Sequence, residues 1–113
     1  MLRLTFFFGL IITLISEAQI VGRVDVCKIY GKIYIVDQKH LADYKVYEEE
    51  TESFANLTVF KQENRFYADK NGQWFITKDK READFWIYMT EQKGQSDFTI
   101  AYTPTESFAG CKQ

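Results

Sequence analysis

The chain has 113 residues, of which 46% are apolar and 17% aromatic. This length suits one small domain, and the high apolar content excludes an intrinsically disordered chain. The 14 basic and 16 acidic residues give a net charge of -2 and are scattered along the sequence. The charge pattern therefore excludes the basic stripe that nucleic-acid-binding proteins carry, and we expect no nucleic-acid partner.

Residues 1–18 have the pattern of a signal peptide. Arg3 supplies a short positive region, an uncharged apolar run follows, and Ser16 and Ala18 are small residues at the positions that signal peptidase reads. The alternative is an uncleaved anchor, but the run is shorter than the roughly 20 apolar residues that span a bilayer. We expect cleavage after Ala18, a single β-repeat domain at 19–113, a secreted or periplasmic location, and membrane contact only through the transient signal peptide.

Two cysteines lie near the ends of the mature chain. Because exported compartments are oxidising, we expect Cys27 and Cys111 to form a disulfide, and the alternative is two free thiols. The bridge would close a loop of more than eighty residues, which chain entropy values at roughly 4 kcal/mol. A domain of this size would gain useful stability from it.

A short repeat runs through the rest of the chain. Its landmark is a small residue, usually Ala, followed by Asp, Asn or Gly, with successive spacings of 13, 13, 15, 13 and 13 residues. The longer unit contains two extra residues around Asn71-Gly72, and a degenerate copy begins at Ile29. The landmark pairs are Ala42-Asp43, Ala55-Asn56, Ala68-Asp69, Ala83-Asp84, Ser96-Asp97 and Ala109-Gly110.

Side chains within each unit alternate between apolar and polar, which is the period of a β-strand. After an eight-residue strand, a 13-residue unit leaves about five residues for a connection, which suits a hairpin, whereas a parallel crossover needs a dozen or more. The sequence therefore predicts an all-β protein, an antiparallel meander of about seven strands. The expected inward-facing residues include Tyr44, Leu57, Trp74, Phe85 and Phe98.

The cysteines also predict closure of the sheet. A disulfide requires Cα atoms within about 7 Å, so a bond between Cys27 and Cys111 would force the first and last strands together. We expect a small barrel whose lumen is filled by side chains, with no room for a buried ligand. The alternatives are an open twisted sheet and a narrow β-solenoid.

The charges at two positions of the repeat unit vary together. Where a unit has Asp after its landmark, the residue four positions earlier is basic, whereas Glu52 precedes Asn56. We interpret this pattern as an ion pair across each turn that helps to set the register, each worth about 1 kcal/mol or less. The expected pairs are Lys39–Asp43, Arg65–Asp69, Lys80–Asp84 and Lys93–Asp97.

Three landmarks together point to a family: the Ala-Asp-x-x-Val-Tyr units, Gly-Gln-Trp-Phe at 72–75, and Ser-Phe-Ala-Gly at 107–110. Over residues 29–111, the chain resembles an uncharacterised bacterial family of short tandem-repeat proteins, a domain of unknown function. The resemblance implies no established activity and supplies no functional residues. The chain departs from the family pattern at Cys111, where a large aromatic residue is more usual, so the disulfide is a feature of this chain.

Catalytic and metal-binding patterns are lacking in the sequence. His40 is the single histidine, and we expect it to be a solvated turn residue because no nucleophile and orienting group accompany it. A zinc site needs several Cys or His ligands, and the chain has three such residues in all. We therefore expect no enzymatic activity, no metal and no cofactor.

Aromatic residues recur at one place in the unit, on the face opposite the predicted core. Such residues can stack on sugars or anchor a protein, or they can pack across strands or under the N-terminal segment. We expect an exported monomer that acts as a non-catalytic binding or interaction module for a protein or glycan. The alternatives are a small secreted enzyme with an unrecognised carboxylate site and a structural envelope component. The candidate binding residues are Tyr34, Tyr47, Phe60, Phe75, Tyr88 and the adjacent Trp86.

Overall fold

The computed structural model describes residues 24–111, so the expected signal peptide and its cleavage site lie outside the described residues. This part of the chain has seven strands and no α-helix, and a one-turn 3-10 helix lies in five of the six connections between consecutive strands. In residues 24–111, no helix has the length and apolarity needed to cross a membrane. The strands are β1 (Gly31–Val36), β2 (Tyr44–Glu48), β3 (Leu57–Lys61), β4 (Gln73–Ile76), β5 (Phe85–Met89), β6 (Phe98–Tyr102) and β7 (Gly110–Cys111). The 3-10 helices are η2 (Val26–Lys28), η3 (Lys39–Leu41), η4 (Glu52–Phe54), η5 (Arg65–Tyr67), η6 (Lys93–Gln95) and η7 (Glu106–Phe108).

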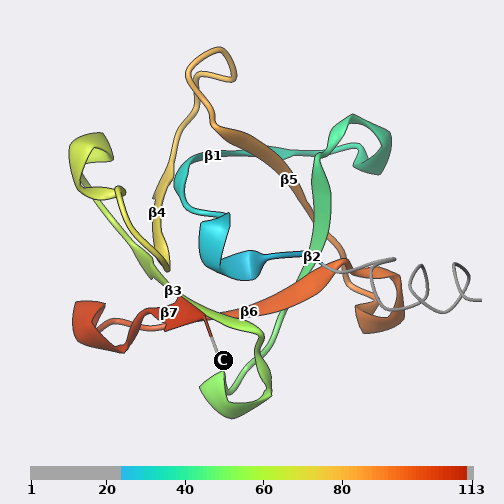
Figure 1. Cartoon of the computed structure of the whole chain (residues 1–113). Helices are drawn as coiled ribbons and strands as arrows, with labels where there is room; N and C mark the ends of the chain where they lie inside the picture. The colour runs from blue at the N-terminus through green and yellow to red at the C-terminus, as the bar shows by residue number, and fades with distance from the viewer. Residues whose placement is uncertain (1–23, 112–113) are drawn as a thin grey trace, which may run out of the picture.

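Six strands form a closed barrel in the order β4-β1-β5-β2-β6-β3, and β3 pairs with β4 to complete the ring. Figure 1 shows this ring from one end, with the helical connections projecting outward. The short β7 pairs in antiparallel orientation with Leu57 and Thr58, the first residues of β3. The all-β class and the closed barrel are therefore confirmed.

The antiparallel meander is wrong, because all six barrel strands run parallel. The prediction assumed strands of eight residues, whereas the barrel strands have four to six. The chain between β1 and β2 then has 7 residues and that between β2 and β3 has 8. At about 3.3 Å per residue, a five-residue strand rises ~17 Å and an eight-residue return can span up to ~26 Å. The connections are thus long enough to return to the start of the barrel.

Consecutive strands of the chain are not neighbours in most of the ring. β5 lies between β1 and β2, and β6 lies between β2 and β3. The chain therefore circles the barrel once with β1, β2 and β3, and its second circuit fills the gaps left by the first (Figure 1). An open sheet and a solenoid are both excluded by this interleaved order.

The inward-facing side chains form a solid layer across the barrel. One residue from each strand, four positions after the landmark in the ordinary units, is fully buried there, and these residues fill the lumen as in other small barrels. Of the aromatic residues predicted to face inward, Trp74 belongs to this layer and the others lie beside it. The ring centroid of Tyr44 is 5.8 Å from that of Phe98 and 6.1 Å from that of Phe85. The layer consists of Ile33, Val46, Val59, Trp74, Ile87 and Ile100.

The N-terminal segment, residues 24–30, closes the end of the barrel at which the strands begin, and we call it the N-terminal plug. η2 lies over the middle of the ring in Figure 1, and the residues around it pack on the core. The backbone carbonyl of Ile29 accepts a hydrogen bond from Trp74 Nε1 at 2.8 Å. The N-terminal plug is thereby tied to the buried layer.

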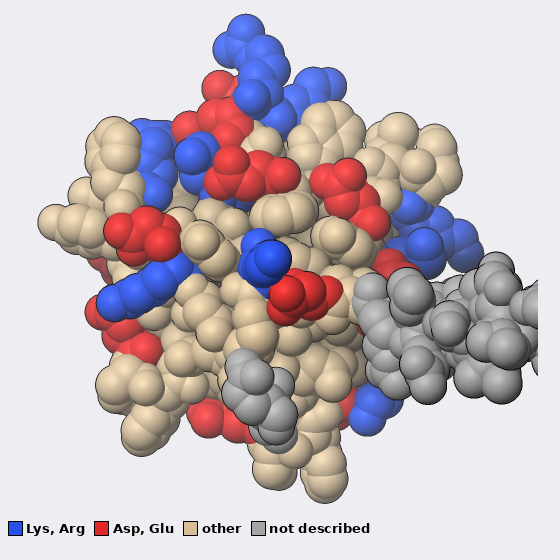
Figure 2. All heavy atoms as spheres, in the orientation of Figure 1, with Lys and Arg blue, Asp and Glu red and all other residues tan. Residues whose placement is uncertain are grey.

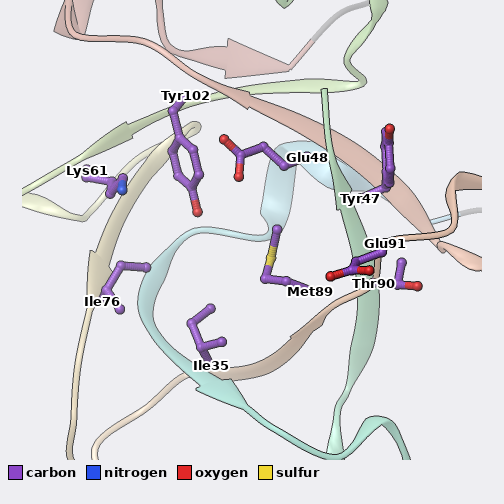
Figure 3. A pocket seen from close by; sticks show the side chains of 9 residues that line it. All are labelled: Ile35, Tyr47, Glu48, Lys61, Ile76, Met89, Thr90, Glu91 and Tyr102. Atoms are coloured by element: carbon purple, nitrogen blue, oxygen red, sulfur yellow. The ribbon is translucent and has the colours of Figure 1, made fainter. Parts of the chain in front are cut away.

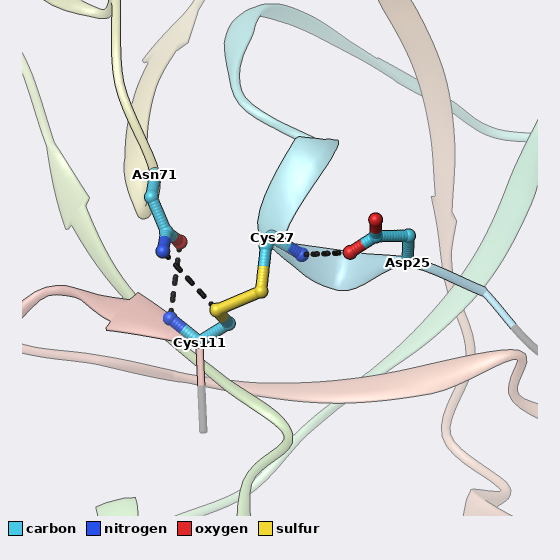
Figure 4. Close-up of a disulfide and its surroundings, with 4 residues drawn as sticks. All are labelled: Asp25, Cys27, Asn71 and Cys111. Atoms are coloured by element: carbon cyan, nitrogen blue, oxygen red, sulfur yellow. Dashed lines mark hydrogen bonds between the residues drawn. A yellow bond between two sulfur atoms is a disulfide. The ribbon is translucent and has the colours of Figure 1, made fainter. Parts of the chain in front are cut away.

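The disulfide between Cys27 and Cys111 is present, with a Cα–Cα distance of 5.1 Å. Its predicted role was wrong, because the barrel closes through β4 and the bond joins η2 to the added strand β7. Asn71 also supports this strand, since its side-chain oxygen accepts from the backbone N–H of Cys111 at 3.0 Å (Figure 4). Gly72 permits the close approach, because a Cβ there would lie 2.4 Å from the backbone nitrogen of Gly110.

The predicted ion pairs across the turns are also wrong. The four ion pairs in residues 24–111 join Lys32–Asp84, Arg65–Glu82, Arg81–Asp79 and Lys93–Glu49. The landmark acids instead bind the backbone of the neighbouring strand. For example, the Asp43 carboxylate accepts from the N–H of Trp86 at 2.7 Å, and the N–H of Asp43 donates to the carbonyl of Trp86 at 2.7 Å.

The same reciprocal pair of hydrogen bonds recurs around the ring. Asp84 makes both hydrogen bonds with the backbone of Lys32, Asp97 with that of Lys45, and Asn56 with that of Thr99. Each of these hydrogen-bond pairs joins the start of β5, β6 or β3 to a strand that is more than forty residues away in the chain. The landmark residue therefore sets the register between the two circuits, and Asn serves as well as Asp because both side chains offer an acceptor oxygen.

We expect Asp43→Ala to lower the free energy of unfolding by about 1–2 kcal/mol, because the N–H of Trp86 loses its charged acceptor. Asp43→Asn should cost less, since the amide oxygen can still accept. Lys39→Ala tests the ion-pair interpretation and should change stability by less than about 0.5 kcal/mol. Urea unfolding of the three variants measures these effects. If Lys39→Ala lowers the free energy of unfolding as much as Asp43→Ala does, the interpretation of an ion pair between Lys39 and Asp43 would be supported again.

Candidate functional site

The parallel arrangement brings the final residues of all six barrel strands to one end of the barrel. There they surround an open cavity of about 630 Å³, which we call the barrel mouth. Tyr47, Thr90 and Glu91 extend its rim (Figure 3). The six mouth residues, one from each strand, are Ile35, Glu48, Lys61, Ile76, Met89 and Tyr102.

These six residues occupy one position of the repeat. They follow one another along the chain at spacings of 13, 13, 15, 13 and 13 residues, like the landmarks. Two residues earlier in each strand stands a member of the fully buried layer. The lumen is thus filled at mid-height, as predicted, and the space for a ligand lies above that layer.

The interleaved strand order divides the mouth into two sides. Ile76, Ile35 and Met89 come from the adjacent strands β4, β1 and β5 and form an apolar side. Polar residues come from the next three strands, β2, β6 and β3, in the order Glu48, Tyr102 and Lys61. Figure 3 shows the polar side chains together along one margin of the cavity and the two isoleucines across from them.

Tyr102 is the central residue of the polar side. The ammonium nitrogen of Lys61 lies 4.2 Å from the centroid of the Tyr102 ring, which is a cation–π contact. Burial, and to a lesser extent the negative charge of Glu48, raises the pKa of Tyr102 to about 12. The phenol therefore stays protonated at neutral pH and can both donate and accept a hydrogen bond.

Two carboxylates at the mouth have no cation beside them. Neither the carboxylate of Glu48 nor that of Glu91 takes part in an ion pair or hydrogen bond with the residues the structure describes. The nearby Glu49 differs, because Lys93 Nζ lies 2.5 Å from its carboxylate. With Lys61 as the one cation among its lining residues, the mouth has a formal charge of -1.

Apart from Tyr47, the candidate aromatic residues lie outside the mouth, on the outer wall, and all of them are half-buried. Because the barrel is closed, they encircle it and do not form a single cluster. Trp86 packs on Tyr34 with ring centroids 5.5 Å apart, and the guanidinium of Arg65 covers Phe75 at 5.1 Å. Tyr47 is the one candidate residue that lines the mouth. Their role in binding stays a prediction.

More exposed aromatic residues lie on the projecting 3-10 helices. Phe54 in η4, Phe66 and Tyr67 in η5, and Phe108 in η7 are 63% to 75% exposed. Sequence analysis missed these residues, although the pentapeptide Thr-Glu-Ser-Phe-Ala occurs at both 51–55 and 105–109. The position before the landmark is thus a surface position, and it lies apart from the barrel mouth.

Sequence analysis also missed the mouth itself. Its signal was present, since the sixth residue after each landmark, or the eighth in the longer unit, changes from Ile to Glu, Lys, Met or Tyr. The position two residues earlier in each barrel strand is apolar throughout. A variable position at the end of an otherwise uniform strand indicates a surface that is free of packing constraints.

Charge and potential metal ligands add no second site in the described part of the chain. Basic and acidic side chains are interspersed on the face shown in Figure 2. Residues 24–111 contain no group of three or more His, Cys, Asp and Glu side chains that could hold a metal ion. His40 is exposed in η3. The barrel mouth is therefore the candidate site.

Comparison with known proteins identifies the family. No curated protein and no solved structure matches the chain significantly. The 7(1) septoil knot domain family matches residues 26–112, almost the whole described region. The family match confirms the expectation of a repeat-like domain. In this chain the matched region folds into the two interleaved circuits described above. The chain belongs to the 7(1) septoil knot domain family.

Proposed function

We propose that this protein is an exported, non-catalytic binding module whose ligand occupies the barrel mouth. The observation that carries the proposal is the two-sided ring, in which an apolar side faces a polar side across a cavity of about 630 Å³. Ligand sites are usually concave and largely apolar, with a few polar groups that orient the ligand. The mouth meets this description.

The chemistry of the mouth favours binding over catalysis. Its lining residues include no histidine and no cysteine. Tyr102 has a pKa of about 12, which opposes the formation of a phenolate at neutral pH. A general base or nucleophile needs a pKa nearer the working pH. Tyr102 therefore offers the secreted-enzyme alternative no base or nucleophile, and the carboxylates of Glu48 and Glu91 have no histidine or cysteine among the lining residues to act with.

Export is supported by the Cys27–Cys111 disulfide, because such bonds persist in oxidising compartments. The signal-peptide pattern of residues 1–18 points the same way. Partners of an exported module reach it from the periplasm or the medium. The appropriate source of ligands is thus the medium or periplasmic extract of the producing cells.

Ligand capture tests the proposal. The protein is incubated with that extract, separated by gel filtration, and its bound small molecules are identified by mass spectrometry. We expect Glu48→Trp to lose the bound molecules, because the indole would occupy the mouth. Glu50→Trp is the matched control, since Glu50 is exposed but does not line the mouth. Both variants should keep the thermal midpoint of the parent protein.

Tyr88→Ala separates the mouth from the aromatic outer wall. Tyr88 is one of the outer-wall aromatics and does not line the mouth, so this variant should retain the ligand. Loss of the ligand in Tyr88→Ala together with retention in Glu48→Trp would move the site to the outer wall. A parent protein that retains nothing would contradict a small-molecule binding function.

A further inference from the structure

We infer that the ligand of the barrel mouth carries an ammonium group on an apolar body. This inference rests on the proposed function and specifies the chemistry of the ligand. It starts from charge, because Glu48 and Glu91 face the cavity without ion-pair partners among the described residues. A cation is the electrostatic complement of that surface.

Lys61 offsets one of the two negative charges and leaves the mouth at a formal charge of -1. Its ammonium lies over the Tyr102 ring at 4.2 Å and forms no ion pair with either carboxylate. Glu48 and Lys61 come from β2 and β3, and the intervening strand β6 places Tyr102 between them. Glu48 and Lys61 therefore face the cavity from opposite sides of the Tyr102 side chain. A ligand cation can meet Glu48 without displacing Lys61.

The apolar side of the mouth determines the chemistry of the rest of the ligand. Ile35, Ile76 and Met89 pack on the core below and leave part of their surface exposed to the cavity. Burial of apolar ligand surface there is favourable by roughly 25 cal/mol per Å². A fully polar amine would leave this side in contact with water, so an apolar body is required.

Three probes with the same eight-carbon alkyl chain separate the contributions: n-octylamine, n-octanol and n-nonanoate, each titrated at pH 7. Methyl resonances of Met89, Ile35 and Ile76 report binding at the mouth, because these residues form its apolar side. We expect octylamine to bind most tightly and nonanoate most weakly. The difference between these two in Kd should be at least about tenfold, which corresponds to ~1.4 kcal/mol.

Variants then assign the preference to its source. The double change Glu48→Gln and Glu91→Gln should bring the Kd of octylamine to that of octanol, with octanol unchanged. Lys61→Gln should widen the preference for octylamine over nonanoate. Glu50→Gln removes an exposed carboxylate that does not line the mouth, and it should leave all three affinities unchanged.

The possible failures are distinct. Equal Kd values for all three probes, or tightest binding of nonanoate, would overturn the ammonium inference and leave the mouth as a binding site. Octylamine binding that survives the double Glu variant would also overturn it. No methyl shift with any probe would contradict both the inference and the proposed site.

Discussion

Trp74→Ala should lower the free energy of unfolding by about 3–5 kcal/mol, the usual cost of replacing a buried tryptophan by alanine. Trp74 is the largest residue of the buried layer and is fully inaccessible to water. Its removal leaves a cavity in the middle of the barrel. It also deprives the carbonyl of Ile29 of the hydrogen bond that ties the N-terminal plug to the core.

Phe75→Ala is the matched control for this prediction. Phe75 is the next residue of β4 and points to the outer wall, where it is half-buried beside Arg65. We expect a much smaller loss, since truncation there opens no internal cavity. Urea unfolding followed by circular dichroism compares the two variants. Equal losses would show that the outer aromatic residues act as a second core, and the aromatic-wall binding hypothesis would then fail.

Replacing both cysteines by serine should lower the free energy of unfolding by roughly 4–5 kcal/mol, the chain-entropy value for a closed loop of this size. The bond joins residues separated by 84 positions, so it restricts nearly the whole unfolded domain. In the folded protein it holds the N-terminal plug against β7. Without the bond, we expect the plug and β7 to exchange their amide hydrogens faster than the barrel strands.

The measurement uses urea unfolding of the parent protein and the double variant, each with and without a thiol reductant. Reductant should destabilise the parent to the level of the variant, and it should leave the variant unchanged. A double variant as stable as the oxidised parent would show that hydrogen bonds such as that between Asn71 and Cys111 suffice to hold this end. The disulfide would then have no role in the stability of the domain.

The period-two pattern within each repeat unit predicted the strands and their buried side. This prediction was reliable because alternation is a local property, and a residue such as Val46 is inward-facing whether its strand has parallel or antiparallel neighbours. The disulfide was also predictable, since it required only the two cysteines and the inference of export. The 13-residue spacing did not reveal which strands pair.

Pairing was decided by the tertiary structure. Asp43 binds the backbone of Trp86, a residue 43 positions away, and nothing in a single repeat unit distinguishes that partner from the next unit along the chain. The repeats are similar enough to accept either neighbour, so the order of strands depends on how two circuits fill one closed ring. The mouth follows from that order, because only interleaving places Tyr102 between Glu48 and Lys61. The sequence thus determined which side chains face inward, and closure of the barrel determined which of them meet.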